Sequence, residues 1–218
     1  MTTNREVFDS IATSWYGFRH WPLLRDELDE MAERWGSGRL INLGCAHGAD
    51  FLPFSGRFEL TGLDFSSEML RNSRTYMGKH GFAAVLVQGD LQALPIKTSS
   101  FDYAVAVASY HHIAGERQRH EAFHELQRIL RPGGEAFLTV WNHGQLRFRD
   151  GPQDLHVPWR SGTSTLERFY HLYRYDELRE MLQGAALDVL RMEPERHHQE
   201  GNIEASRNIC ALVKKRDK

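Results

Sequence analysis

Glycines and carboxylates fall at spacings in this chain that suit a ligand containing a ribose. An apolar run leads into Gly44-Cys-Ala-His-Gly48, and a second apolar run ends at Asp64. Asp90 and Ala108 close two further apolar runs. In an open α/β sheet neighbouring strands end at a ligand crevice, where an acid commonly holds two ribose hydroxyls. The pattern indicates a site for a cofactor that contains a nucleoside.

The spacing of the glycines distinguishes between such cofactors. A dinucleotide fold requires Gly-x-Gly-x-x-Gly, so that a pyrophosphate lies against a helix N-terminus. Here the register is Gly44-x-Ala46-x-x-Ala49, and no Gly-x-x-x-x-Gly-Lys-Ser/Thr phosphate loop is present. A cofactor without phosphate fits better, and S-adenosylmethionine is the obvious candidate. A plain strand-to-helix connection remains the alternative for the turn alone, and a helix N-cap remains the alternative for Asp64 or Asp90 taken singly.

These residues need a framework of alternating strands and helices. Helical spacing from about residue 5 to 35 is expected to break near Trp21-Pro22, because proline disfavours helix in the residue before it. Strands separated by helices imply an α/β, Rossmann-like fold with a mostly parallel seven-stranded sheet, helices on both faces and an N-terminal helical lid. The last two strands share a short polar loop and are expected to pair antiparallel. Strands are predicted at residues 40–43, 58–63, 84–87, 101–108, 135–141, 186–191 and 209–213, and further helices at 49–55, 66–80, 116–130 and 174–182.

One domain is expected over residues 1–218, with residues 1–37 as the lid and 142–173 as a substrate-side loop and insertion. Residues 142–165 are rich in Gly, Pro, Arg and His and predict a long loop, which is usually functional at that length.

A net charge of −2 argues against a strongly cationic nucleic-acid coat but leaves room for a local basic face. Two distant cysteines read as reduced thiols, and no signal peptide or membrane-length apolar run is evident. We therefore expect a cytoplasmic protein without a membrane partner.

Four motifs over roughly residues 38–140 together resemble the class I S-adenosylmethionine-dependent methyltransferases. They are the turn at residues 44–48, the segment 63–70, the pair 89–95 and 100–103, and Leu130-Arg-Pro-Gly-Gly134. Two residues depart from the family pattern: Asn42 stands where an acid is usual and could weaken contact with the methionine ammonium, and Ala46 replaces the central glycine and narrows the turn slightly. The resemblance implies that the cofactor contacts Asn42, Gly44, Cys45, Ala46, Gly48, Asp64, Phe65, Ser66, Asp90, Leu91 and Ala108.

Segments outside that core are similar to the tRNA wobble-uridine carboxymethyl methyltransferases. The similar segments are residues 11–22, 109–119, 139–142 and 168–174. This resemblance implies methyl ester formation on a carboxymethyl group of uridine 34 in tRNA, together with a small zinc-binding activator subunit as partner. The C-terminal residues 200–216 depart from that family, which leaves the positioning of the RNA less defined. A small-molecule methyltransferase of the same class and a non-catalytic cofactor-binding subunit are the competing hypotheses.

The acceptor chemistry suggests roles for a few side chains. A carboxylic acid with a pKa of about 4 is ionised at neutral pH, so the enzyme must align and desolvate it rather than deprotonate it. Arg19, one turn from Tyr16, is expected to clamp a carboxylate, either that of the substrate or that of the cofactor. Of His111 and the histidine that follows it, one is expected to line the site and the other to pack, with His111 as the catalytic candidate. Trp141 is expected either to stack on a base or to pack in the core.

The remaining charged and aromatic residues leave alternatives open. Twelve histidines show no spacing typical of a metal site, so no metal is expected. Several arginines could form a phosphate track or merely solvated charge; these are Arg117, Arg119, Arg147, Arg149 and Arg160. Three phenylalanines could offer an activator surface or belong to the core; these are Phe51, Phe54 and Phe82.

Overall fold

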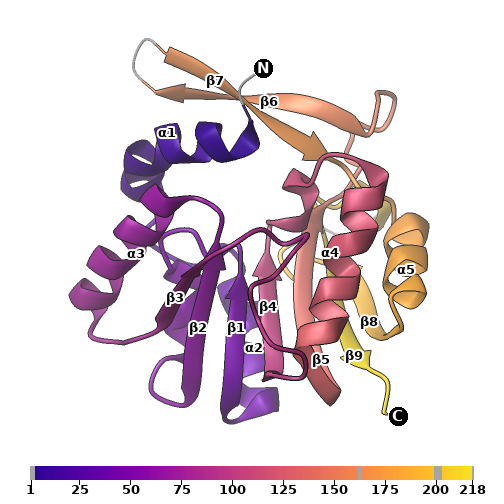
Figure 1. Cartoon of the computed structure of the whole chain (residues 1–218). Helices are drawn as coiled ribbons and strands as arrows, with labels where there is room; N and C mark the ends of the chain where they lie inside the picture. Colours follow the sequence, from indigo (N-terminus) through magenta and orange to yellow (C-terminus); the bar gives the residue numbers. More distant parts are fainter. Residues whose placement is uncertain (1–2, 162–163, 199–202, 218) are drawn as a thin grey trace.

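The computed structural model describes residues 3–161, 164–198 and 203–217. A seven-stranded sheet in the order β3-β2-β1-β4-β5-β9-β8 forms the centre of the molecule (Figure 1). Strands β1 to β5 are parallel to one another, and β9 is antiparallel to both β5 and β8. The predicted seven-stranded, mostly parallel sheet and the antiparallel last pair are confirmed. The strands are β1 (Gly38–Leu43), β2 (Phe58–Asp64), β3 (Val85–Gln88), β4 (Phe101–Val107), β5 (Leu130–Trp141), β8 (Leu187–Pro194) and β9 (Asn208–Lys215).

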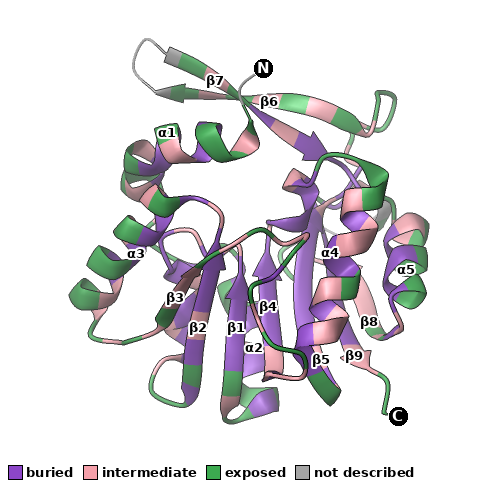
Figure 2. Cartoon of the chain, in the orientation of Figure 1, coloured by how far each residue is buried: buried purple, intermediate pink, exposed green. Residues whose placement is uncertain are grey.

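Helices cover both faces of this sheet, which is why its central strands are apolar on both sides (Figure 2). On one face α4 (Glu116–Ile129) and α5 (Tyr175–Gly184) bury residues such as Phe123 and Leu178. On the other face α2 (Arg25–Trp35) and the 3₁₀ helix η1 (Ala49–Phe54) pack against β1, while α3 (Ser67–His80) lies beside β2 and β3. The segment at 49–54 was expected to be an α-helix, and Pro53 inside it accounts for the tighter form.

The phenylalanines offered as a partner surface belong to the second of these cores. Phe51 and Phe54 have no exposed area, so the surface placement is wrong for them. Phe54 stacks on Trp35, and Phe82 is half-buried against the ring of Phe51. A surface near β2 and β3 must therefore be made by other residues.

Residues 142–165 were predicted to form one long loop, and this prediction is wrong for the second half of the segment. Strand β6 (Asp154–Ser161) pairs antiparallel with β7 (Ser164–His171) in a separate two-stranded hairpin. Inward-facing Leu155, Val157 and Trp159 alternate with exposed polar residues, which is the period of a half-buried strand. Pro158 lowers the strand signal in the sequence, yet a two-stranded hairpin tolerates proline because each strand has a free edge.

Helix α1 (Asn4–Phe18) and the β6–β7 hairpin lie together above the carboxyl ends of the parallel strands, and we call this pair the roof (Figure 1). The Asn4 side chain donates to the carbonyls of His112 and Phe169, and the Trp159 indole donates to Ser14 Oγ at 2.9 Å. The chain leaves α1 at Phe18 and enters α2 at Arg25, so the expected break near Trp21-Pro22 is confirmed. In the ranges that are described, no helix combines the length and apolar character needed to span a membrane.

Candidate active site

A cavity of about 280 Å³ lies between the roof and the carboxyl edge of the sheet. That volume is near the lower end of the range for small-molecule sites, about 300 to 1,000 Å³. Its wall combines α1, the turn after β1, the segments that follow β2 and β3, and the end of β4 with η2 (Tyr110–His112). The parallel strands thus end at one shared ligand crevice, as the sequence predicted.

The turn after β1 brings backbone close to this cavity. Gly44 has φ +74°, and a Cβ there would lie 2.4 Å from Ser109 Cβ, so glycine is required. The amides of Gly44 and Cys45 donate to the Leu63 carbonyl at 2.8 and 3.0 Å, which ties the turn to the end of β2. Ala46 has φ +46°, a conformation that costs a non-glycine residue about 1 kcal/mol or more. The substitution of the usual glycine therefore strains the backbone in addition to narrowing the turn.

Asp64, at the end of β2, connects the turn to the start of α3. Its Oδ2 accepts from the Ala46 amide at 2.8 Å and its Oδ1 from the Ser66 amide at 2.9 Å. Burial raises the pKa of Asp64 to about 6, against the lowering effect of these hydrogen bonds. Each carboxylate oxygen has a further lone pair, and the residue lines the cavity. The geometry fits a diol such as the 2′ and 3′ hydroxyls of a ribose.

Three charged or polar side chains line the cavity at the opposite end of the turn. His47 and Asp50 come from the turn and the residues after it, and Arg19 comes from the segment that follows α1. The Nε of Arg19 and both ring nitrogens of His47 are buried without a hydrogen-bond partner. Burial, and then the Arg19 charge, lowers the pKa of His47 to about 4, so the imidazole is neutral. Burial raises the pKa of Asp50 to about 6, while Arg19 lowers it. Arg19 itself lies over the Trp15 ring, with Cζ 4.5 Å from the ring centroid.

The structure brings most, but not all, of the expected site residues to this cavity. Those on its wall are Arg19, Gly44, Cys45, Ala46, Asp64, Phe65, Asp90, Leu91 and Ala108. Those away from its wall are Tyr16, Asn42, Gly48, Ser66, His111 and Trp141.

The residues away from the wall have other surroundings. Asn42 is fully buried in β1, with both atoms of its amide unpartnered. Ser66 caps α3: its Oγ accepts from the Met69 amide and donates to Asp9. Gly48 has φ +91°, and a Cβ there would approach Ser73 Oγ at 2.9 Å. Tyr16 meets the His47 ring edge-on, with centroids 5.8 Å apart.

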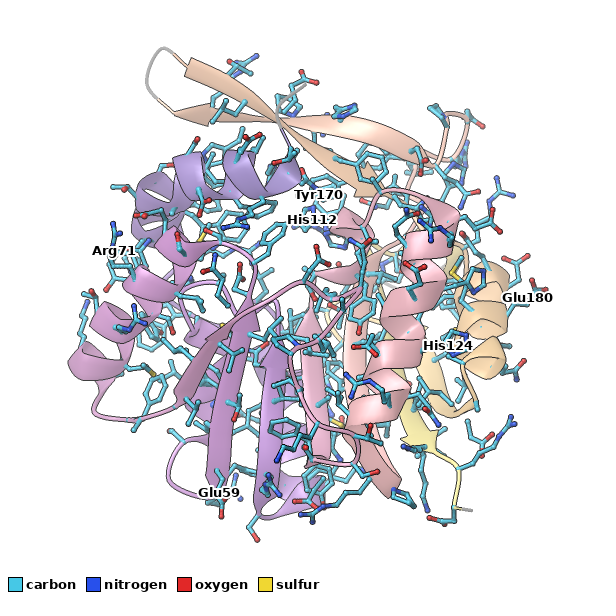
Figure 3. The ribbon with its side chains drawn as sticks, in the orientation of Figure 1. Glu59, Arg71, His112, His124, Tyr170 and Glu180 are labelled. Carbon is cyan, nitrogen blue, oxygen red and sulfur yellow. The ribbon has the colours of Figure 1, made fainter. Side chains whose placement is uncertain are left out.

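A second group of aromatic side chains lies beneath the hairpin. His112 lines the cavity and lies beside Tyr170 of β7, with ring centroids 4.4 Å apart (Figure 3). His111 stacks on Tyr170 at 4.8 Å, and Trp141 lies 4.6 Å from the same tyrosine. Arg168, also on β7, places Cζ 4.9 Å from the Trp159 ring centroid. Among these side chains His112 alone lies on the cavity wall, so the group borders the cavity through that histidine.

Hydrogen bonds assign the tautomers of the two histidines. The Trp141 amide donates to His111 Nδ1 at 3.2 Å, so the His111 proton is on Nε2. His112 Nδ1 lies 3.0 Å from the Phe169 carbonyl oxygen, so this nitrogen carries the proton and Nε2 is an acceptor. Burial lowers the pKa of His112 to about 3 and lowers that of His111 well below its usual value. Both histidines are therefore neutral at physiological pH.

The electrostatic field at this end of the site is positive. After burial, the groups that lower the pKa of His111 are His112 and the arginines Arg168, Arg19 and Arg207. Burial raises the pKa of Tyr170, and the same three arginines oppose that rise. Arg168 is buried and its Nε has no hydrogen-bond partner. A positive, partly desolvated field of this kind favours an anionic ligand.

Two of the arginines expected to form a phosphate track are paired with acidic neighbours. Arg117 pairs with Glu121 at 3.1 Å, and Arg149 with Asp150 at 3.6 Å. Arg119 is buried and so cannot face a nucleic-acid backbone, which removes it from the expected track. Across the residues that the structure describes, no cluster of three or more His, Cys, Asp or Glu side chains could hold a metal ion.

The sequence contained usable signals for several site residues that were not predicted. Arg168 and Tyr170 face inward with Leu166, at every second position of β7, so a period-two scan of that segment would have found the hairpin. Asp50 follows the glycine turn directly, in a chain that lacks the usual acid at position 42. Asn4 had no signal, because its contacts are with residues more than 100 positions away.

Comparisons with known proteins agree with this geometry. A family model described as a methyltransferase domain matches residues 40–134. A protein of Encephalitozoon cuniculi (strain GB-M1), provisionally named a methyltransferase, is 30% identical over 179 residues, 79% of this chain and 80% of that protein. The protein of Schizosaccharomyces pombe (strain 972 / ATCC 24843) named tRNA (carboxymethyluridine(34)-5-O)-methyltransferase is 26% identical over 212 residues, 85% of this chain and 88% of that protein.

Solved structures show the same fold. An S-adenosylmethionine-dependent methyltransferase from Clostridium acetobutylicum ATCC 824 superposes with a TM-score of 0.74 at 17% identity, over 88% of this chain and 91% of that chain. A chain from a complex between the Haloferax volcanii Trm112 methyltransferase activator and a provisionally assigned methyltransferase gives a TM-score of 0.71 at 17% identity, over 99% of both chains.

The chain belongs to the class I S-adenosylmethionine-dependent methyltransferase family. Its cofactor is S-adenosylmethionine, and the residues present fit that group. The turn at Gly44 brings backbone to the cavity wall, and Asp64 retains acceptors for ribose hydroxyls. Unpartnered polar atoms of Arg19 and His47 lie at the other end of the turn, where a charged amino-acid moiety can meet them.

Proposed function

We propose that this methyltransferase forms a methyl ester on the carboxymethyl group of 5-carboxymethyluridine at the wobble position of tRNA. Two findings support the proposal. The S. pombe relative that matches over 85% of this chain carries the name of that activity. The group of side chains beneath the hairpin, which borders the cavity at His112, has the charge that such a substrate needs.

The observation that carries the proposal is the positive field around His111 and Tyr170. Every charged group that shifts the pKa of His111 is a cation or a second histidine, and Arg168 is buried there with an unpartnered Nε. The Arg168 guanidinium shares a hydrogen bond with Tyr170, but its buried Nε is left unsatisfied, and a buried unsatisfied donor is costly unless a ligand supplies an acceptor. An amine acceptor would gain nothing from Arg168 and Arg207, whereas a carboxylate is attracted and held in its reactive ionised form. The site therefore favours an oxyanion as methyl acceptor.

When bound, S-adenosylmethionine supplies an electrophilic methyl group on a sulfonium. The side chains of this chain then have orienting roles, because a carboxylate with a pKa of about 4 needs no general base at neutral pH. Arg168 is proposed to attract the acceptor carboxylate, and His112 to contact the substrate from the cavity wall. Tyr170 and Trp141 form an aromatic group beside them that can stack on the uracil ring. The roof excludes water from both reactants, which strengthens these interactions.

An activator subunit is the second part of the proposal, and the exposed edge of the sheet at β3 is its proposed site. Strand β3 is one end of the sheet and presents Val85 with 64% of its area exposed. An unpaired edge with an exposed apolar side chain is a template for strand addition by a partner. The H. volcanii structure with a Trm112 activator has the same fold as this chain, which supports a partner of that kind.

The test uses tRNA that carries 5-carboxymethyluridine at the wobble position. The chain, with and without a Trm112-type subunit, is incubated with this tRNA and labelled S-adenosylmethionine, and the digested nucleosides are analysed by mass spectrometry. The proposal expects the wobble nucleoside to gain one methyl group as an alkali-labile ester. Absence of the ester with the activator present would refute the substrate assignment. Methylation of free carboxymethyluridine but not of tRNA would instead indicate a small-molecule enzyme.

The docking site is tested separately with Val85→Asp. This change should abolish co-purification with the activator, because it places a charge on the exposed edge, while binding of S-adenosylhomocysteine stays unchanged. Leu190→Asp on β8, the opposite edge, is the matched control, since Leu190 is 47% exposed. A complex that survives Val85→Asp and is lost with Leu190→Asp would place the partner at β8.

A further inference from the structure

We propose that Asp50 binds the ammonium group of the cofactor's methionine moiety and acts with Arg19, which binds the carboxylate, to replace the acid that this chain lacks at position 42. The inference requires only the S-adenosylmethionine cofactor and is independent of the methyl acceptor. It assigns a cofactor role to Asp50, and it assigns Arg19 to the cofactor rather than to the substrate.

The chain needs such a replacement because position 42 cannot contact the cofactor. Asn42 is neutral, fully buried in β1 and absent from the cavity wall. Both polar atoms of its amide lack a hydrogen-bond partner, so the residue does not act through a relay to the site. The ammonium of the cofactor must therefore find its counter-charge elsewhere, because an unpaired charge in a desolvated site is costly.

Asp50 lies where that counter-charge is needed. Asp64 at one end of the glycine turn fits the ribose, and Asp50 is at the other end, two residues after Gly48 and at the start of η1. The cofactor is an elongated molecule with the ribose and the amino-acid moiety on either side of its sulfur. If Asp64 binds the ribose, the amino-acid moiety extends along the turn toward Arg19 and Asp50.

Arg19 and Asp50 complement a zwitterion as a pair. Arg19 is close enough for its charge to lower the pKa of Asp50, and Asp50 raises the pKa of Arg19 in return. Within the described part of the chain the two side chains form no ion pair with each other within 4.0 Å. Both are thus available to a ligand that carries one positive and one negative group. A substrate carboxylate alone would match Arg19 and leave Asp50 facing an anion.

His47 gives an independent sign of a ligand at this end. It is 2% exposed and lines the cavity, and apart from the Arg19 backbone its ring nitrogens have no hydrogen-bond partner in the described structure. Burial, together with the Arg19 charge, lowers its pKa and keeps it neutral, so it can donate one hydrogen bond and accept another. The amino-acid moiety offers both an acceptor carboxylate and a donor ammonium to such a group.

The experiment is a matrix of ligands and variants measured by isothermal titration calorimetry at pH 7.5. The ligands are S-adenosylhomocysteine, decarboxylated S-adenosylmethionine, which keeps the ammonium, and 5′-methylthioadenosine, which lacks the whole amino-acid moiety. Asp50→Asn should lower the affinity for S-adenosylhomocysteine and for decarboxylated S-adenosylmethionine by roughly tenfold or more. It should leave the affinity for 5′-methylthioadenosine within about twofold of the parent value. Arg19→Gln should lower the affinity for S-adenosylhomocysteine by a similar factor and leave the affinities for the other two ligands unchanged.

Two controls keep the result interpretable. Asp29→Asn makes the same change in net charge on the exposed surface of α2 and should leave all three affinities unchanged. Asp50→Glu keeps the charge and should retain most of the affinity for S-adenosylhomocysteine, and thermal unfolding without ligand shows that each variant is folded. The proposal is overturned if Asp50→Asn binds S-adenosylhomocysteine as tightly as the parent. It is equally overturned if Asp50→Asn lowers the affinity for 5′-methylthioadenosine by the same factor as that for S-adenosylhomocysteine.

Discussion

The floor of the cavity and its roof are built by different means. The floor is backbone: strand ends and a glycine turn from one continuous stretch of sequence, held by short amide hydrogen bonds such as that from Ala46 to Asp64. The roof joins residues 4–18 to residues 154–171 through a few side-chain contacts, among them Asn4 to Phe169 and Trp159 to Ser14. We propose that the floor binds the cofactor and that the roof contacts the methyl acceptor. This division predicts that changes in one region leave the function of the other intact.

The largest expected effect is on the floor. Asp64→Ala removes the acceptor for ribose hydroxyls and for the amides of Ala46 and Ser66. We expect the dissociation constant of S-adenosylhomocysteine to rise roughly tenfold or more, because charge-assisted hydrogen bonds are lost. The free energy of unfolding should also fall by about 2 kcal/mol, since two amides near the turn lose their acceptor. Calorimetry and urea denaturation measure both quantities, and an unchanged dissociation constant would mean that the ribose lies elsewhere.

The matching change in the roof is Arg168→Gln. It should lower kcat/KM for carboxymethylated tRNA by about tenfold, because the acceptor carboxylate loses its buried cation. Affinity for S-adenosylhomocysteine should stay within about twofold of the parent, because Arg168 is not on the cofactor wall. Arg179→Gln, at an exposed position of α5, is the control and should leave activity unchanged. Equal losses of cofactor affinity and turnover in Arg168→Gln would show that roof and floor are not separable.

The floor could be read from the sequence and the roof largely could not, for a physical reason. The local sequence predicts the floor, because hydrophobic periodicity and turn residues follow from backbone geometry. These signals located the strand ends and the site residues Gly44, Asp64 and Asp90. The hairpin has the correct alternation, but Pro158 and the polar residues around it gave that segment the composition of a loop. The choice between His111 and His112 depended on which ring faces the cavity, and that is set by Phe169 and Tyr170, far away in sequence.

The burial of His112 beneath the roof should also be visible in the pH dependence of the free energy of unfolding. The folded-state pKa of His112 is about 3, below the value of about 6.5 in the unfolded chain, so the unfolded state takes up a proton that the folded state refuses. Stability from this residue is present above pH 6.5 and is lost as the pH falls toward 3. Between pH 7 and 5 the parent should lose about 1 to 2 kcal/mol more than His112→Gln. Asp50 and Asp64, whose pKa values are raised, act in the opposite direction, but they do so equally in both proteins.

Denaturant unfolding at the two pH values gives this difference directly. Asn4→Ala is a useful companion, because it loosens the tie between α1 and η2 without removing a titratable group. It should lower stability equally at both pH values. A pH dependence that is the same in the parent and in His112→Gln would show that His112 is hydrated and that the roof is open in solution.

The smallest effect tests the strain stored in the floor. Ala46→Gly relieves a left-handed backbone conformation at φ +46°, which favours the folded state by about 1 kcal/mol, but glycine also gains freedom in the unfolded chain, at about 0.4 to 1 kcal/mol. The net gain should be at most about 0.5 kcal/mol, or roughly 1 to 2 °C in Tm. Ala49→Gly, in the 3₁₀ helix that follows, has no strain to relieve and should destabilise by about 1 kcal/mol. Ala49 is buried and Ala46 half-buried, so the loss at Ala49 also includes the packing of its methyl group, and the sign of the change at Ala46 is what reports the strain. If Ala46→Gly destabilises as much as Ala49→Gly, the turn is unstrained, and the departure from the family glycine at position 46 imposes no backbone penalty.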